Sequence, residues 1–336
     1  MIVATSPKGD NMHKTVLGAR RLFLAAGLAL CVPAFAQGAA TFPNKPIRMI
    51  VPFTPGGGSD AAARFFGEKL SAALGQPVLV DNRPGGNSGS IGTTFVKSQP
   101  ADGYTLLLGS TAPLVTNVVM VKDLPYDAAK DFKPVAGLTK NMTAIVVPPG
   151  SPYRTLAELV AASKKSALNA GTASEGFHLA ADWFASSAGF KYTHVPYKGL
   201  TQVLTDVAGG YLDWAIVDLA GATPLLQGHR IRALAVTDEA RHPFFSRVPT
   251  VKESGYPEFV YNTWTSIHVR SDTPDDITGK LAEATMKIVA SDAARAYAQK
   301  AGTQLLPLGS EEFAKYQREE VERFQKVAES SGIKPE

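Results

Sequence analysis

The fold is decided by the stretch IRMIVPFTPGGGSDAAARFFGEKLSAAL, residues 47–74. A short apolar run, two prolines and three consecutive glycines precede a helical pattern, so this stretch predicts a strand, a tight loop and a helix from about Asp60. Glycine has no Cβ, and the first N–H groups of a helix have no intrahelical partner, so the loop presents partial positive charge at one point. We therefore expect the loop to bind an anion, and a carboxylate fits.

Other interpretations of this loop remain open. It lacks the Lys-Ser or Lys-Thr of a Walker loop and the G-x-G-x-x-G spacing of dinucleotide sites, which argues against nucleotide binding. In a purely structural interpretation, Ser59 caps the helix and Gly56 to Gly58 only turn the chain. Asp60 would repel a bound carboxylate. It is therefore either a first-turn acid favoured by the helix dipole or an acid that faces a ligand with an amine or hydroxyl group.

The first 36 residues have the three-part pattern of a secretory signal peptide. Basic residues precede the apolar run LFLAAGLALCVPAFA, and small residues precede Gln37. We predict a signal peptide over residues 1–36, cleaved after Ala36, with Met12 as a possible start. The only cysteine, Cys31, lies inside it, so the mature chain would have no disulfide. This pattern predicts a bacterial periplasmic protein.

Composition narrows the class of partner. The formal net charge of +4 falls to about +1 once the charges of the predicted leader are removed, so we expect no nucleic-acid partner. The remaining 300 residues, from Gln37 to Glu336, are long enough for two domains.

The strand, loop and helix pattern recurs along the chain. The predicted strand PVLVDN (77–82) runs directly into RPGGNSGSIG (83–92), a second glycine-rich turn, and the predicted strand YTLLLGS (104–110) ends in Ser110 and is followed by Thr111. LNAGTASEG (168–176) repeats the pattern in the second half, whereas 122–135 reads as a loop. The alternation predicts an α/β fold with parallel strands, and ligands bind outside the carboxyl ends of such strands. Two half-sites predict a cleft between two lobes.

The residues resemble a known family. PNKPIRMIVPFTPGGGSD, VLVDNRPGGNSGSIG, YTHVPYKGLTQVLTDVAGGYLDWAIVD and RALAVTDEARHPFFSRVPTVKESGYPEF occur in the order found in the solute-binding proteins of tripartite tricarboxylate transporters, the Bug family. The resemblance implies two Rossmann-like lobes joined by crossover strands, with periplasmic-binding-protein type II architecture. It implies lobe I over residues 37–142 and 262–336, and lobe II over 143–261. It also implies that a small carboxylate is captured between the lobes and delivered to a membrane permease.

The site follows from the resemblance position by position. It implies ligand contacts from Pro55, Gly56, Gly57, Gly58, Ser59, Asp60, Asn87, Ser88, Gly89, Ser110, Thr111, Asn141, Thr172, Ala173, Ser174, His178 and Asp218. The run PGGNSGS departs from the family's more usual PGAGG, so we expect Asn87 and Ser88 to contribute side chains. Asp218 ends a strand, where it either faces the cleft or caps the next helix.

The sequence contains no recognisable catalytic or metal-binding pattern. The chain has no G-x-S-x-G elbow. None of the histidines after residue 36 has a second potential metal ligand at a spacing typical of metal sites. A hydrogen-bonding or structural role suits His178 better than a metal site. We therefore expect a monomeric binding protein, without a cofactor and without enzymatic activity. A ligand-presenting protein for a membrane sensor kinase, or a secreted hydrolase, are the alternatives.

Overall fold

The structure of the chain is a computed structural model that describes residues 42–333. The predicted signal peptide, with Ala36 and Cys31, lies outside these residues. The helices and strands follow in the order β1 (Ile47–Val51), α1 (Gly58–Leu74), β2 (Val78–Asn82), η1 (Asn87–Gly89), α2 (Ser90–Lys97), β3 (Thr105–Ser110), η2 (Ala112–Thr116), α3 (Asn117–Met120), β4 (Phe132–Val147), α4 (Leu156–Ser163), β5 (Leu168–Thr172), α5 (Glu175–Ala188), β6 (Tyr192–Pro196), α6 (Leu200–Gly209), β7 (Trp214–Asp218), α7 (Leu219–Gln227), β8 (Arg232–Val236), η3 (Pro243–Phe245), β9 (Asn262–Arg270), α8 (Asp275–Val289), α9 (Asp292–Ala301), β10 (Gln304–Leu305) and α10 (Ser310–Ser331).

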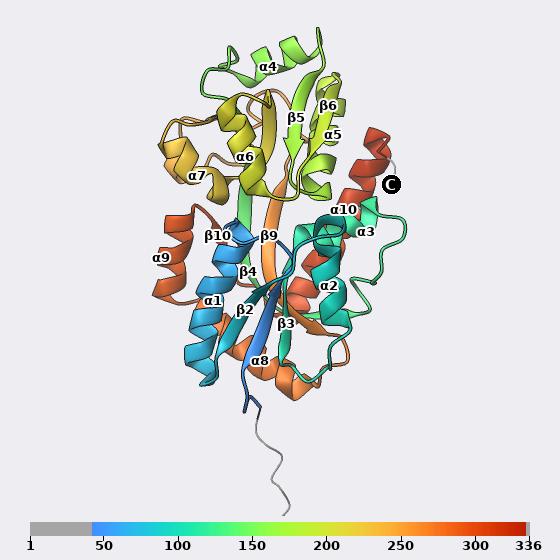
Figure 1. Ribbon diagram of the computed structural model, residues 1–336, viewed down its shortest axis with the longest axis vertical. Coiled ribbons are helices and arrows are strands. Elements are labelled where there is room, and N and C mark those ends of the chain that lie inside the picture. Colours follow the sequence, from blue (N-terminus) through green and yellow to red (C-terminus); the bar gives the residue numbers. More distant parts are fainter. Residues whose placement is uncertain (1–41, 334–336) are drawn as a thin grey trace, which may run out of the picture. The chain divides into compact units, whose positions relative to one another are not determined.

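Ten strands form one sheet in the order β2-β1-β3-β9-β4-β7-β5-β6, and β8 and β10 also pair with β4. Strands β1, β2 and β3 are mutually parallel, as are β5, β6 and β7. The long strand β4 joins the two parallel groups. It pairs with β9 up to Met142 and with β7 from Thr143, in both cases antiparallel. Figure 1 shows β4 and β9 running between the two groups of strands and helices.

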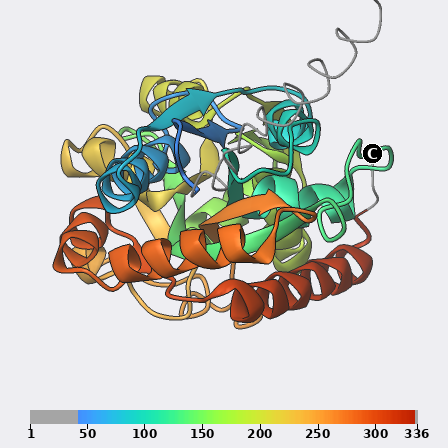
Figure 2. The same cartoon turned by 90° about the horizontal axis from the view of Figure 1, so that it is seen from below.

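Side-chain alternation along the strands explains how helices cover both faces of the first group. Ile47, Met49 and Val51 of β1 pack into one apolar cluster with α1 and α8, whereas Ile50 packs into a second cluster with α2 and α10. Successive side chains of a strand point to opposite faces, and a strand buried on both faces is apolar throughout. Figure 2 shows helices on both sides of the strands.

The second group of strands is covered in the same way. Ala144 and Val146 of β4 pack with α6 and α7, and Ile145 packs on the other face in a cluster that includes Phe184 of α5 and Trp214 of β7. The predicted α/β fold of two Rossmann-like lobes with a cleft between them is confirmed. The loop prediction for 122–135 was wrong at its end. Strand β4 already begins at Phe132, because its buried residues pair with β9 far along the chain.

None of the helices described between residues 42 and 333 is long and apolar enough to cross a membrane.

Candidate ligand-binding site

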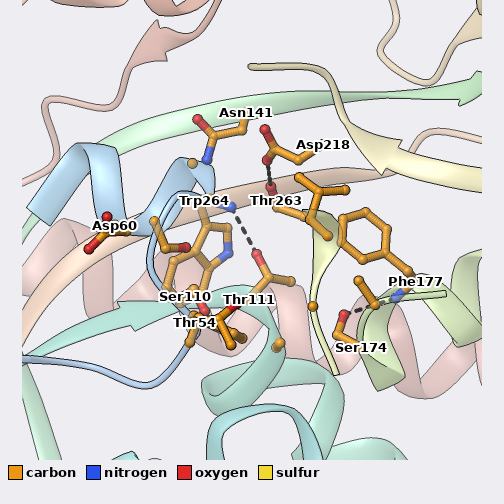
Figure 3. A pocket seen from close by; sticks show the side chains of 18 of the residues that line it. Thr54, Asp60, Ser110, Thr111, Asn141, Ser174, Phe177, Asp218, Thr263 and Trp264 are labelled. Atoms are coloured by element: carbon orange, nitrogen blue, oxygen red, sulfur yellow. Dashed lines mark hydrogen bonds between the residues drawn. The ribbon is translucent and has the colours of Figure 1, made fainter. Parts of the chain in front are cut away.

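A cavity of about 100 Å³ lies where the strand ends of the two lobes meet. It is lined by Phe53, Thr54, Gly57, Gly58, Ser59, Asp60, Ser110, Thr111, Ala112, Asn141, Ala173, Ser174, Phe177, Lys198, Gly199, Leu200, Asp218, Tyr261, Thr263 and Trp264. Figure 3 shows ten of these side chains labelled around the cavity. They come from loops of both lobes and from the strands that connect them, so the predicted convergence of strand ends is present.

The amino terminus of helix α1 opens into this cavity. Its N-cap residue is Gly57, and no side chain caps this end of the helix. The interpretation of Ser59 as the helix cap was therefore wrong. Ser59 is the second helical residue, and both it and Gly58 line the cavity. Because the first N–H groups of a helix lack intrahelical acceptors, this end offers donors and positive potential to an anion.

Asp60 is held by its own lobe. Its carboxylate accepts hydrogen bonds from Arg64 Nε (3.0 Å), the backbone N–H of Gly56 (3.0 Å) and Asn82 Nδ2 (3.0 Å). Burial raises the pKa of Asp60, but these hydrogen bonds outweigh that effect and leave its pKa below the ordinary value. Asp60 is thus an ionised carboxylate whose charge is compensated by Arg64. Its hydrogen bond from Gly56 also holds the glycine loop in place.

Strand β3 delivers two hydroxyl groups to the cavity. Thr111 Oγ1 accepts a hydrogen bond from the backbone N–H of Trp264 at 2.9 Å, which ties the β3 loop to strand β9 (Figure 3). Ser110 is 6% exposed, and its Oγ has no hydrogen-bond partner among the described residues. The indole Nε1 of Trp264 is likewise buried without a partner among them. Both residues line the cavity, and buried polar atoms are nearly always hydrogen-bonded in native proteins, so these two groups are donors that a bound acceptor would satisfy.

Asp218 faces lobe I from the end of β7. Its Oδ1 accepts from the backbone N–H groups of Ala220 (3.1 Å) and Gly221 (3.4 Å), and its Oδ2 accepts from Thr263 Oγ1 (3.2 Å). Both interpretations of Asp218 therefore hold, because it caps α7 and also lines the cavity. No cation of the described chain pairs with it. Burial raises the pKa of Asp218, and these hydrogen bonds offset the effect only in part.

The loop before α6 forms the wall opposite the glycine loop. Lys198, Gly199 and Leu200 line the cavity, and Lys198 is the only basic residue among its described lining residues. A Cβ at Gly199 would lie 2.7 Å from Thr54 Oγ1 of lobe I. Only glycine allows this approach without a shift, because real Cβ atoms do not come so close to oxygen. The two lobes are in contact here.

Ten residues named from the sequence line the cavity, namely Gly57, Gly58, Ser59, Asp60, Ser110, Thr111, Asn141, Ala173, Ser174 and Asp218. Seven do not, namely Pro55, Gly56, Asn87, Ser88, Gly89, Thr172 and His178. Gly56 donates to Asp60, and Thr172 Oγ1 is hydrogen-bonded to His194 Nε2 at 2.7 Å. His178 stacks on His194 with ring centroids 3.7 Å apart.

The second glycine-rich turn is also placed outside the lining. Asn87 is exposed, and its carbonyl oxygen accepts from Asn117 Nδ2 at 2.6 Å. Ser88 reaches across to helix α5 of the other lobe. Within residues 42–333, no group of three or more His, Cys, Asp or Glu side chains is arranged to hold a metal ion.

Sequence reasoning missed ten lining residues, namely Phe53, Thr54, Ala112, Phe177, Lys198, Gly199, Leu200, Tyr261, Thr263 and Trp264. One signal was available, because the run YKGLT between β6 and α6 repeats the pattern of a strand, a glycine and a helix. Tyr261, Thr263 and Trp264 carry no such signal. Thr263 and Trp264 reach the cavity because β9 pairs with β3 and β4, and Tyr261 directly precedes this strand.

Comparisons with known proteins agree with this geometry. A family model described as "Tripartite tricarboxylate transporter family receptor" matches residues 62–333. The chain is 35% identical over 318 residues to a UPF0065 protein from the tcbD-tcbE intergenic region of Pseudomonas sp. (strain P51), covering 93% of this chain and 94% of that protein. It is also 35% identical over 266 residues to BugT of Bordetella pertussis, covering 76% of this chain and 81% of BugT.

A solved structure is similar over nearly the whole described chain. This is R. palustris Rpa4515 with adipate, which has a TM-score of 0.85 and 31% sequence identity and covers 88% of this chain and 100% of that one. The fold, the strand-end cavity and the match over residues 62–333 agree with the Bug-type motifs quoted above, and they show that the chain belongs to the tripartite tricarboxylate transporter receptor family.

Proposed function

We propose that this protein binds a small organic carboxylate in the cavity between its lobes and delivers it to the membrane permease of a tripartite tricarboxylate transporter. The observation that carries the proposal is the buried, unpartnered hydroxyl of Ser110 in the same cavity as the uncapped amino terminus of α1. A hydroxyl donor and several helix N–H donors around one space suit a carboxylate, which only accepts hydrogen bonds.

The donors are sufficient for useful affinity. A hydrogen bond to a charged group contributes roughly 1.5 to 3 kcal/mol, and micromolar binding corresponds to about −8 kcal/mol. Four such bonds at the upper end of this range, about 12 kcal/mol together, reach micromolar affinity after about 4 kcal/mol is lost to ordering the ligand. The donors named above belong to lobe I, and Ser174 and Lys198 of lobe II line the same cavity. A ligand that touches both lobes favours the closed arrangement, as in hinged binding proteins generally.

The proposal also covers where the protein acts and what happens to its ligand. The chain acts in the periplasm after its signal peptide is removed, releases its ligand chemically unchanged, and presents the closed form to the permease. Adipate, present in the similar protein Rpa4515, is a first ligand to test. The exposed Lys198 at the cavity offers a cation to a second carboxylate.

The test is isothermal titration of protein that has been unfolded, dialysed and refolded to remove copurified ligand. Small mono-, di- and tricarboxylates are each paired with the corresponding uncharged amide. We expect at least one acid to bind with a stoichiometry of one while its amide does not.

Ser110→Ala should weaken that acid by about 10- to 100-fold, the loss of one charge-assisted hydrogen bond. Ser98→Ala is the matched control, because Ser98 Oγ is exposed and donates locally to the carbonyl oxygen of Phe95. Equal binding of acid and amide, or unchanged affinity in Ser110→Ala, would refute the carboxylate site. Uptake of the acid by cells with and without this gene tests the delivery step.

A further inference from the structure

Ser88 forms a hydrogen bond between the two lobes at a place outside the cavity. The backbone N–H of Glu175, the first residue of helix α5, donates to Ser88 Oγ at 2.6 Å. Neither residue lines the cavity. The bond joins the turn between β2 and α2 to the amino terminus of the helix that follows β5, and these two elements belong to different lobes.

The backbone of Ser88 has a conformation that is rare for a residue other than glycine. Its φ of 44° and ψ of 49° lie in the left-handed region, which non-glycine residues rarely adopt and which costs free energy. Two glycines of the same turn, Gly86 and Gly89, also have positive φ. A left-handed serine persists only where the surrounding structure fixes it.

The turn that carries Ser88 is fixed to lobe I on both sides. Before it, the carbonyl oxygen of Asn87 accepts from Asn117 Nδ2 at 2.6 Å. After it, the carbonyl oxygen of Gly89 accepts from Thr93 Oγ1 at 3.0 Å, and a Cβ at Gly89 would lie only 2.8 Å from Pro52 Cβ. The Ser88 hydroxyl therefore moves with lobe I.

The donor side of the bond is equally well defined on helix α5. The N-cap residue, Ser174, accepts from the N–H of Phe177 at 3.4 Å, which leaves the N–H of Glu175 for another acceptor. In the structure this acceptor comes from the opposite lobe. A helix amino terminus has four such orphan donors, and a hydroxyl oxygen satisfies one of them in the way an N-cap does.

We infer that Ser88 is a positioning residue that caps helix α5 only when the lobes are closed, and so sets the balance between the open and closed forms without touching the ligand. The inference rests on the proposed function for its link to affinity. Its structural part, an interlobe bond made in the closed form, stands independently of any ligand. A contact that stabilises only the binding-competent form tightens the apparent affinity for every ligand by the same factor.

The test combines a distance measurement with titration. Spin labels on Ala73→Cys of α1 and Ala161→Cys of α4, both exposed positions, report the separation of the lobes in the chain that follows Ala36, which has no other cysteine. Without ligand, Ser88→Ala should shift the distance distribution toward the open form. With a saturating acid, its distribution should coincide with that of the parent protein.

The titrations use several acids on the same variants. Ser88→Ala should weaken all of them by one common factor of about 3- to 10-fold, the worth of one ordinary hydrogen bond. Ser88→Gly should weaken binding equally while folding at least as stably as the parent, because glycine adopts the left-handed conformation without strain. This variant separates the loss of the cap from damage to the fold, and Ser98→Ala should change nothing.

Two results would overturn the inference. One is an unchanged distance distribution together with unchanged affinities in Ser88→Ala. The other is a loss that differs between acids by more than threefold, since that would make Ser88 a ligand contact. If no carboxylate binds any form of the protein, the proposed function fails, while the ligand-free distance distribution still decides the role of Ser88.

Discussion

Gly58 of helix α1 lies against Asp218 of strand β7, so closely that a Cβ at Gly58 would be 3.3 Å from Asp218 Oδ1. The two residues belong to different lobes, and both line the cavity. A separation of 3.3 Å is tighter than ordinary van der Waals contact. The absence of a side chain at position 58 therefore allows the two walls to approach, as well as exposing the N–H groups of α1.

Gly58→Ala should weaken ligand binding by about 5-fold, because overpacking of about 1 kcal/mol is added only in the closed form. The fold should remain intact, since position 58 has no left-handed backbone. Titration with the best acid and thermal unfolding measure the two effects. Gly279→Ala is the control, because Gly279 is an exposed glycine of α8 with nothing within 4 Å of its Cβ position. If Gly58→Ala and Gly279→Ala bind the acid equally well, the closed form accommodates a methyl group at position 58 and the prediction is wrong.

Gly199→Ala should weaken binding by about 10-fold or more, because its methyl group meets Thr54 Oγ1 at 2.7 Å in the closed form. The backbone of Gly199 is extended, so alanine fits it in the open form. Thr54→Ala should restore part of the loss in the double variant, because Thr54 Cβ is 3.9 Å away. A double-mutant cycle of the affinities measures this coupling. Strictly additive losses would contradict a direct clash between the two residues.

Much of the site could be predicted because its loops follow local rules. Glycines, serines and threonines at the ends of apolar strands identified the loop at Gly57 to Asp60, the pair Ser110 and Thr111, and Ser174 before α5. In parallel sheets such strand ends converge at one edge, so local sequence patterns were enough to predict a common cleft.

The rest depended on contacts that no local pattern encodes. Thr263 and Trp264 lie inside strand β9, and they reach the cavity through pairing with strands more than a hundred residues away. Thr172 and Ser88 have hydroxyl groups in suitable loops, but these hydroxyls are taken by His194 and by helix α5. The partner of each hydroxyl is decided by packing between elements, within one lobe for Thr172 and across the lobes for Ser88. The spacing of residues along the chain does not encode these contacts.

Asp218→Asn should remove a pH dependence of carboxylate binding. The pKa of Asp218 is raised by burial, so this group is neutral at low pH and becomes charged as the pH rises. A charged Asp218 repels a carboxylate in the same cavity. We therefore expect the affinity of the parent protein for an unsubstituted dicarboxylate to fall by about 5- to 10-fold over the pH range in which Asp218 loses its proton, whereas the affinity of the variant stays constant over that range.

Titrations across this pH range check the expectation, with Asp276→Asn, an exposed acid of α8, as the control. The sign reverses for a ligand whose ammonium or hydroxyl group faces Asp218, because the charged acid then attracts it. Parallel pH profiles for the parent and Asp218→Asn would show that Asp218 keeps one charge state throughout.

His268 should make the stability of the protein depend on pH. Its ring is completely buried in strand β9, with Nε2 3.0 Å from Gln317 Oε1 and Nδ1 3.1 Å from Ser266 Oγ. Burial lowers the pKa of His268 from 6.5 to about 4, since the charged ring would lose its hydration. Between these values the unfolded chain binds a proton that the folded chain does not, so stability is lost as the pH falls below 6.5.

Because of this difference in proton binding at His268, the free energy of unfolding should fall by about 2 kcal/mol when the pH is lowered from 7.5 to 5. Urea unfolding at several pH values measures the change. His268→Gln should be less stable at pH 7.5 but should lose less stability on acidification, because glutamine does not titrate. His229→Asn is the matched control, since His229 is exposed and asparagine tolerates its φ of 54°. The prediction is wrong if the free energy of unfolding falls equally for His268→Gln and the parent between pH 7.5 and pH 5. The His268 ring would then be protonated in the folded chain as readily as in the unfolded chain.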